Sequence, residues 1–102
     1  MTKPEVTAIV YDKKGQVLGI AKNSYLKTHP LQAKLAREVG EPCKIYLHAE
    51  IAAIIKLKEL KDAHSIAVFR FGADGSPRNA RPCRVCQRAI KLAGIKDVTY
   101  TR

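Results

Sequence analysis

A run of mostly β-branched and apolar residues characterises the beginning of the chain. Residues 5–11 alternate between two sets of mostly β-branched and apolar side chains, as expected of a β-strand. The polar stretch 12–15 includes Gly15 and is typical of a turn, and residues 16–21 return to an apolar pattern. This part of the sequence predicts a β-hairpin that ends before Asn23.

A helical period follows in the next segment. Leu31, Leu35 and Val39 recur every four residues and would form one apolar stripe on a helix. Pro30 suits the first helical position, and Gly40 ends the pattern. We therefore expect a helix that begins at Pro30, with its stripe packed into the core.

The middle of the chain predicts a second helix and a buried strand. The apolar run 51–55 lies in a stretch from Leu47 to about Leu60 that predicts a buried helix. Residues 65–71 contain the continuous apolar run 66–69, which is typical of a central strand covered on both faces.

The last part of the chain predicts a strand, a helix and another strand. Glycine and proline in residues 72–77 indicate a loop, and the segment with Cys83 and Cys86 is expected to be helical as far as Gly94. Residues 96–101 then predict a final strand. A helix between two strands favours a right-handed parallel crossover, so the expected fold class is α/β.

The length of 102 residues suits one domain, residues 1–102. The sequence has no apolar run of the roughly 20 residues that span a bilayer, and no signal-peptide pattern. We therefore expect a cytoplasmic protein that has no membrane partner.

The formal net charge is +10, and eight basic residues against two acidic ones lie from Arg70 to Arg102. A positive field there would attract a nucleotide phosphate or a nucleic-acid backbone. The same residues could equally be solubilising surface charges, and the sequence leaves both interpretations open.

His48, Cys83 and Cys86 predict a zinc site. One imidazole and two thiolates fill three positions of a tetrahedron and leave the fourth for water, as in catalytic zinc sites. The cysteines are one helical turn apart, with Pro82 expected at the first helical position, and the histidine precedes the buried helix. Zinc would then bridge the starts of two helices, and Glu50 would handle protons.

The remaining cysteine and histidines have simpler explanations. Cys43 lies outside any ligand spacing and is expected to be structural. His29, before Pro30, is expected near a helix cap or at the surface. His64 is expected at the surface where a strand starts.

The motif His48-Ala49-Glu50, followed by Pro82-Cys83-Arg84-Val85-Cys86, resembles the signature of the cytidine deaminase-like superfamily. The resemblance covers nearly the whole chain except residues 24–46. It implies a three-layer α/β/α fold with a mixed four-stranded sheet, whose last strand is parallel after a helical crossover.

The same resemblance implies the roles of individual residues. His48, Cys83 and Cys86 would bind Zn²⁺, and Glu50 would be the catalytic proton shuttle. Asn23 would contact the sugar or base of the substrate, and backbone groups near Ala49 and Pro82 would hold the amine and the base edge.

The implied activity is hydrolytic deamination of the cytosine base of cytidine, deoxycytidine or deoxycytidylate to uracil, with release of ammonia. Cytosine in single-stranded nucleic acid is the alternative substrate, and a purine base stays open because the signature is shared. The candidate aromatic contacts are Tyr25, Tyr46, Phe71 and Tyr100. An inactive zinc-binding module is the non-enzymatic alternative.

The resemblance also bears on assembly. Relatives commonly add a fifth strand and terminal helices that wall the pocket. Because this chain ends after the fourth predicted strand, either the pocket is open or neighbouring subunits close it, and we expect a homo-oligomer.

Overall fold

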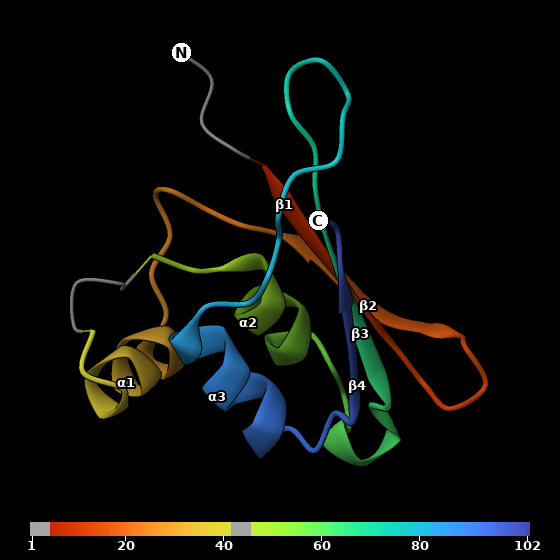
Figure 1. Cartoon of the computed structure of the whole chain (residues 1–102). Coiled ribbons are helices and arrows are strands. Elements are labelled where there is room, and N and C mark those ends of the chain that lie inside the picture. The colour runs from red at the N-terminus through yellow and green to blue at the C-terminus, as the bar shows by residue number, and fades with distance from the viewer. Residues whose placement is uncertain (1–4, 42–45) are drawn as a thin grey trace.

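The computed structural model describes residues 5–41 and 46–102 (Figure 1). In this part of the chain the elements follow in the order β1 (Val6–Tyr11), β2 (Val17–Lys22), α1 (Pro30–Glu38), α2 (Ala49–Ile55), the 3₁₀ helix η1 (Leu60–Asp62), β3 (Ser65–Arg70), α3 (Arg84–Leu92) and β4 (Asp97–Tyr100). No helix of the described residues is both long enough and apolar enough to cross a membrane.

The strands form one mixed sheet in the order β2-β1-β3-β4. β1 pairs antiparallel with β2 and β3, whereas β4 runs parallel to β3 after the α3 crossover. Asp12 stabilises the β1–β2 turn, because its carboxylate accepts hydrogen bonds from the backbone N–H groups of Lys14 and Gln16. The predicted hairpin, the mixed four-stranded sheet and its parallel last strand are confirmed.

α2 packs against the face of the sheet formed by β1 and β2, and it supplies the centre of the core. Gly19 of β2 allows this close approach, since a Cβ atom there would lie 3.0 Å from the carbonyl oxygen of Ala53. The side chains of Ala8, Val10 and Val68, which face α2 from the sheet, are fully buried. α3 packs against both α2 and α1, and the apolar stripe of α1 lies in the core as predicted.

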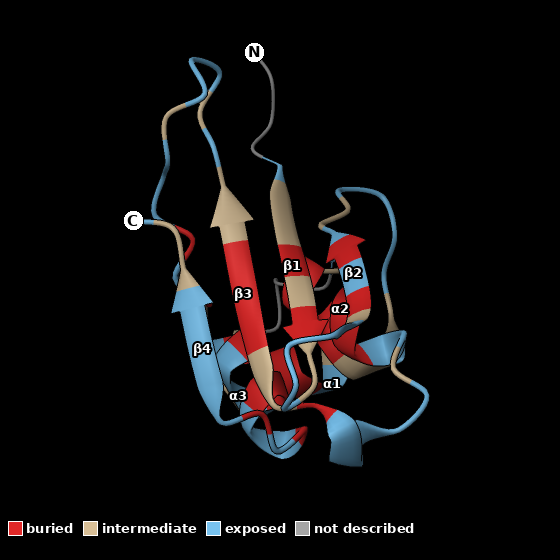
Figure 2. Ribbon diagram, turned by 90° about the vertical axis from the view of Figure 1, so that its right-hand side faces the viewer, coloured by how far each residue is buried: buried red, intermediate tan, exposed pale blue. Residues whose placement is uncertain are grey.

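The three α-helices α1, α2 and α3 lie on the same side of the sheet (Figures 1 and 2). The helical layer expected over the opposite face is not found in this part of the chain. On that face, Ile20 is 52% exposed and stands beside Ile9 in the register of β1 and β2. β3 is nevertheless buried at its centre, because β1 and β4 flank it and Ala67 is small enough for its neighbours to cover.

The second helix is shorter than predicted. The sequence suggests a helix from Leu47 to about Leu60, but α2 ends at Ile55. Beyond it, Lys56 donates a hydrogen bond from its Nζ to the carbonyl oxygen of Ile20, and Leu57 turns back against the core near Gly19. Contacts with β2 therefore end the helix where local propensity alone would continue it.

Candidate metal centre

His48 lies at the start of α2, with extended backbone angles (φ −79°, ψ 154°) that make it the N-cap residue. Its side chain does not cap the helix within the described structure, so the imidazole is directed elsewhere. Two contacts hold its backbone: its N–H donates to Oε1 of Gln32 over 3.3 Å, and its carbonyl accepts from the N–H of Ala52. Gln32 is fully buried in α1, so the segment between β2 and α2 positions the histidine.

Cys83 and Cys86 lie at the start of α3. Cys83 is the N-cap residue with extended backbone, and Cys86 follows within the first turn. Pro82 was expected at the first helical position, but the helix begins at Arg84, so this prediction is wrong by two residues. A fixed proline φ also suits extended chain, and the carbonyl of Pro82 accepts a hydrogen bond from the side chain of Gln87.

The three side chains converge between the two helix starts. Nδ1 of His48 lies 3.4 Å from Sγ of Cys83 and 3.3 Å from Sγ of Cys86, and the ligand atoms all lie within 4.8 Å of one another. Tetrahedral zinc with ordinary bond lengths separates such S and N atoms by roughly 3.6 Å. The cluster therefore fits Zn²⁺ with only small adjustments.

The two thiols are electrostatically unequal. The hydrogen bond from the Cys86 thiol lowers the pKa of Cys83, with a further contribution from His48. The thiolate of Cys83 and burial raise the pKa of Cys86. Without a metal, Cys83 is therefore the thiolate and Cys86 holds the proton, which a zinc ion would displace.

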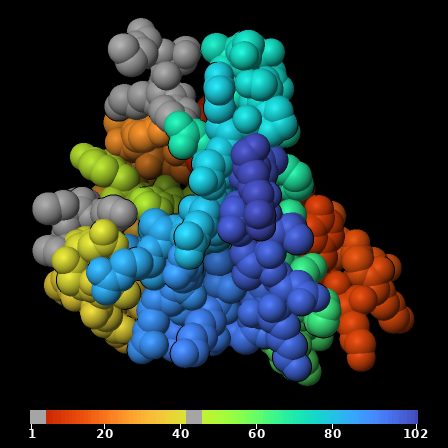
Figure 3. All heavy atoms as spheres, viewed as in Figure 1, coloured from red at the N-terminus to blue at the C-terminus, as the bar shows by residue number. Residues whose placement is uncertain are grey.

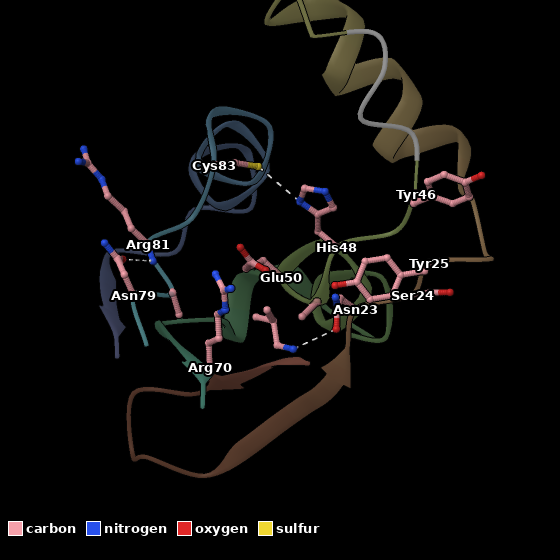
Figure 4. Close-up of a pocket in the computed structure, with 13 residues that line it drawn as sticks. Asn23, Ser24, Tyr25, Tyr46, His48, Glu50, Arg70, Asn79, Arg81 and Cys83 are labelled. Carbon is pink, nitrogen blue, oxygen red and sulfur yellow. Dashed lines mark hydrogen bonds between the residues drawn. The ribbon is translucent and has the colours of Figure 1, made fainter. Parts of the chain in front are cut away.

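Glu50 lies beside the cluster, at the second residue of α2. Its exposed fraction is only 5%. Burial raises the pKa of its carboxyl group, and this outweighs the lowering effects of its own backbone N–H, Cys86 and His48. Figure 4 shows the carboxylate on the same side of the pocket as His48 and Cys83. Because its pKa is raised, this carboxyl group accepts a proton more readily than an exposed one, as proton transfer by a general acid–base group requires.

The family model described as cytidine and deoxycytidylate deaminase zinc-binding region matches residues 1–102. The chain belongs to this family. Comparison with curated proteins finds no match. Members of the family are generally zinc-dependent deaminases, and the cluster of His48, Cys83 and Cys86 in this chain fits the zinc ion that they require.

A cavity of about 360 Å³ opens beside the cluster (Figure 4). His48, Ala49, Glu50 and Cys83 form its floor, and its walls include Asn23, Tyr25, Tyr46, Arg70, Asn79 and Arg81. Hydrogen bonds between backbone groups of Ser24 and Leu47, and of Leu47 and Lys27, join the Tyr25 wall to the segment before His48. The metal centre therefore lies at the bottom of a pocket large enough for a small substrate.

Of the three predicted substrate contacts, Asn23 and Ala49 line the cavity, whereas Pro82 does not. Asn23 lines the cavity, and its Oδ1 also accepts a hydrogen bond from the N–H of Val6, which closes the end of the β1–β2 pair. The fully buried Ala49 lies in the floor. Pro82 is not part of this lining among the described residues; it lines a separate apolar depression beside α3 and β4.

Three further residues, His29, His64 and Cys43, were predicted to have no role in the zinc site. His29 caps α1, since its Nδ1 accepts a hydrogen bond from the N–H of Leu31 over 3.0 Å. His64 precedes β3, and its Nε2 lies 3.3 Å from a carboxylate oxygen of Asp97. Cys43 lies outside the described residues.

The sequence did not single out Gln32, Asn79 or the pocket positions of Arg70 and Arg81. The two arginines were included only in a general basic region. One signal was available: Arg70 ends a strand next to a parallel neighbour, and the carboxyl ends of such strands commonly border ligand sites. Nothing local marks Gln32, which looks like any polar residue of an amphipathic helix.

Proposed function

We propose that the protein is a zinc-dependent hydrolytic deaminase that converts a cytosine base to uracil and releases ammonia. The observation that carries this proposal is a three-ligand metal cluster with one buried carboxylate beside it, at the bottom of a cavity. Structural zinc sites ordinarily have four protein ligands, whereas catalytic sites keep one position for water. In the described part of the chain, the cluster contains only His48, Cys83 and Cys86.

A zinc ion bound by these residues would supply the Lewis acid that activates water at neutral pH. In the proposed reaction, Glu50 removes a proton from the attacking water and delivers it to the ring nitrogen beside the reacting carbon. The water oxygen bonds to that carbon. Glu50 next takes the second proton from the hydroxyl group now on that carbon and gives it to the exocyclic amine, the carbon–nitrogen bond breaks, and ammonia leaves as the carbonyl of uracil forms.

Asn23 and backbone groups near Ala49 are the proposed substrate contacts. Asn23 belongs to the cavity wall and Ala49 to its floor, next to Glu50 in the chain. The proposed contact from Pro82 is limited to the backbone at the Pro82–Cys83 link, because the proline lies outside the cavity lining. These positions would hold the sugar on one side and the exocyclic amine on the other.

Glu50 argues against an inactive zinc-binding module. A buried carboxylate is unfavourable unless its environment compensates for lost hydration, and a core helix gains nothing from one at this position. Its presence beside three metal ligands is explained by proton transfer.

A second candidate function is deamination of cytosine in single-stranded nucleic acid. It is favoured by the exposed rings of Tyr25 and Tyr46 at the cavity wall, which could stack on bases.

The test is to incubate zinc-loaded protein with cytidine, deoxycytidine, deoxycytidylate and a single-stranded oligonucleotide, and to measure uracil and ammonia. We expect turnover of at least one compound, and Glu50→Gln is expected to lower kcat by about 10²- to 10⁴-fold, the usual contribution of a general acid–base group. The variant should retain one zinc per chain by elemental analysis. Zinc-loaded wild-type protein that deaminates none of these compounds would contradict the proposal.

A further inference from the structure

Two arginines in the cavity wall have no acidic partner among the described residues. Two other arginines of the same region are paired with acidic residues, since Arg78 lies 3.5 Å from Asp74 and Arg88 lies 3.9 Å from Glu38. No ion pair joins Arg70 or Arg81 to any residue that the structure describes. Of the described residues that line the cavity, only Glu50 is acidic, and it belongs to the metal centre.

Arg70 is the more deeply placed of the two. It ends β3 with a half-buried side chain, and Figure 4 shows that this side chain points from the strand toward Glu50. Arg81 is exposed, and Figure 4 shows its side chain extending outward from the rim of the cavity, away from Glu50. A partly buried guanidinium group loses part of its hydration, and here no ion pair compensates for that loss. Binding of an anion beside Arg70 is therefore favourable.

The backbone around both arginines is tightly held. Oγ1 of Thr101 accepts a hydrogen bond from the N–H of Arg70 and lies 2.7 Å from the carbonyl oxygen of Arg78. The N–H of Ala80 donates to the carbonyl oxygen of Thr101, and Oδ1 of Asn79 accepts from the N–H of Arg81. Figure 3 shows the end of the chain packed against this segment. The two arginines therefore extend from an ordered wall rather than from a free loop.

We propose that Arg70 and Arg81 form a phosphate-binding wall of the catalytic cavity, so that the substrate is a cytosine nucleotide unit and not a free nucleoside. This inference rests on the proposed deaminase function. A base at Glu50 and the metal centre would place its sugar toward Asn23 and its phosphate toward the arginines. Guanidinium groups bind phosphate oxygens through paired hydrogen bonds, which suits this wall.

The test compares deoxycytidylate with deoxycytidine, which differ only in the phosphate. We expect wild-type protein to prefer deoxycytidylate in kcat/KM by at least about 10-fold, because a charge-assisted hydrogen bond contributes more than a neutral one. In Arg70→Gln, and more weakly in Arg81→Gln, the ratio of the two kcat/KM values should fall by about 10- to 100-fold. Arg88→Gln is the matched control, since Arg88 lies on α3 outside the cavity lining, and its ratio should stay within about 2-fold of wild type.

An equal preference for both compounds, or an equal loss on both in Arg70→Gln, would overturn the inference while leaving the deaminase proposal intact. If no compound is deaminated, the phosphate wall is tested by measuring binding affinity in place of the reaction rate. Zinc-loaded Glu50→Gln protein is titrated with deoxycytidylate and with deoxycytidine by calorimetry, and tighter binding of deoxycytidylate supports the phosphate wall, whereas equal affinities refute it.

A third substrate identifies the source of the phosphate. A thymine oligonucleotide with one central cytosine carries the same phosphate within a strand. Preference for it, with a steep loss of rate as salt rises, would assign the wall to nucleic acid. Preference for the monomer would assign it to a free nucleotide.

Discussion

At the scale of single residues, the metal centre depends on unequal protonation of similar groups. Cys83 and Cys86 have the same chemistry, yet a hydrogen bond lowers the pKa of the first and burial beside the resulting thiolate raises that of the second. Burial raises the pKa of Glu50, so its carboxyl group holds a proton more readily than an exposed carboxyl group does. The site can thus hold a divalent cation and move protons within a few ångströms.

Zinc binding is expected to release about one cysteine proton per chain, because Cys83 is already a thiolate and only Cys86 must lose its proton. Calorimetry at about pH 8, where imidazoles are ordinarily neutral, in buffers of different ionisation enthalpy measures this number. Affinity should therefore weaken as the pH falls. Cys86→Ser, whose hydroxyl keeps its proton, should bind zinc more weakly and release none; two protons from wild type would contradict the assignment.

The hydrogen bond from the His48 N–H to Gln32 is expected to position the histidine for the metal. Gln32→Met keeps the volume but removes the acceptor, so we expect zinc affinity to fall by about 10-fold, as for other supporting contacts of metal ligands. Competition with a chromophoric chelator measures the change. The exposed Gln16→Met serves as the control, and an unchanged affinity in Gln32→Met would show that packing alone holds His48.

At the scale of elements, the site is built where two helices begin beside one end of the sheet. α2 and α3 present His48 and Cys83 as their N-cap residues, so both ligands project from helix starts rather than from flexible loops. The position of α2 depends in turn on its close contact with β2. The hairpin thereby contributes to the geometry of the metal centre without supplying a ligand.

Gly19→Ala is expected to destabilise the protein by about 1–3 kcal/mol, because the added Cβ would press on the carbonyl oxygen of Ala53 and on Leu57. Thermal or urea unfolding of zinc-loaded protein measures the loss. Val17→Ala on the same strand is exposed and should change stability by no more than about 0.5 kcal/mol. Equal stability of Gly19→Ala and wild type would mean that α2 can move away from β2 at little cost.

At the scale of the whole molecule, charge and apolar surface are unevenly distributed. Basic residues gather in the last third of the sequence, which carries the cysteines and one wall of the cavity. The aromatic side chains of Tyr25 and Tyr46 stay exposed on the opposite wall, and Leu26, which follows Tyr25 in the chain, is 90% exposed. The sheet face opposite the helices also carries the exposed Ile20.

The expected homo-oligomer stays a prediction that these surfaces support, because clustered exposed apolar groups commonly mark protein interfaces. Light scattering coupled to size-exclusion chromatography should give a mass that is a multiple of the 11.3 kDa chain. Leu26→Asp would place a charge on the exposed apolar surface beside Tyr25 and is expected to lower that mass if this surface is part of the interface. A mass of one chain at all concentrations would contradict the expectation.

The sequence by itself determined the features that depend on short spacings. The Cys83 and Cys86 spacing, the histidine before an apolar run, the turn at Asp12 and the alternation in β1 are local patterns with local physical causes, so the cysteine pair at one helix start and the hairpin followed from them. The joining of His48 to these cysteines and the parallel β4 were predicted from the motif as a whole and from the strand-helix-strand order. Tertiary structure alone decided which distant residues meet. Gln32 supports His48, α2 stops at Ile55, the helices share one face of the sheet, and Arg70 and Arg81 border the cavity, because these outcomes depend on packing between segments far apart in the chain.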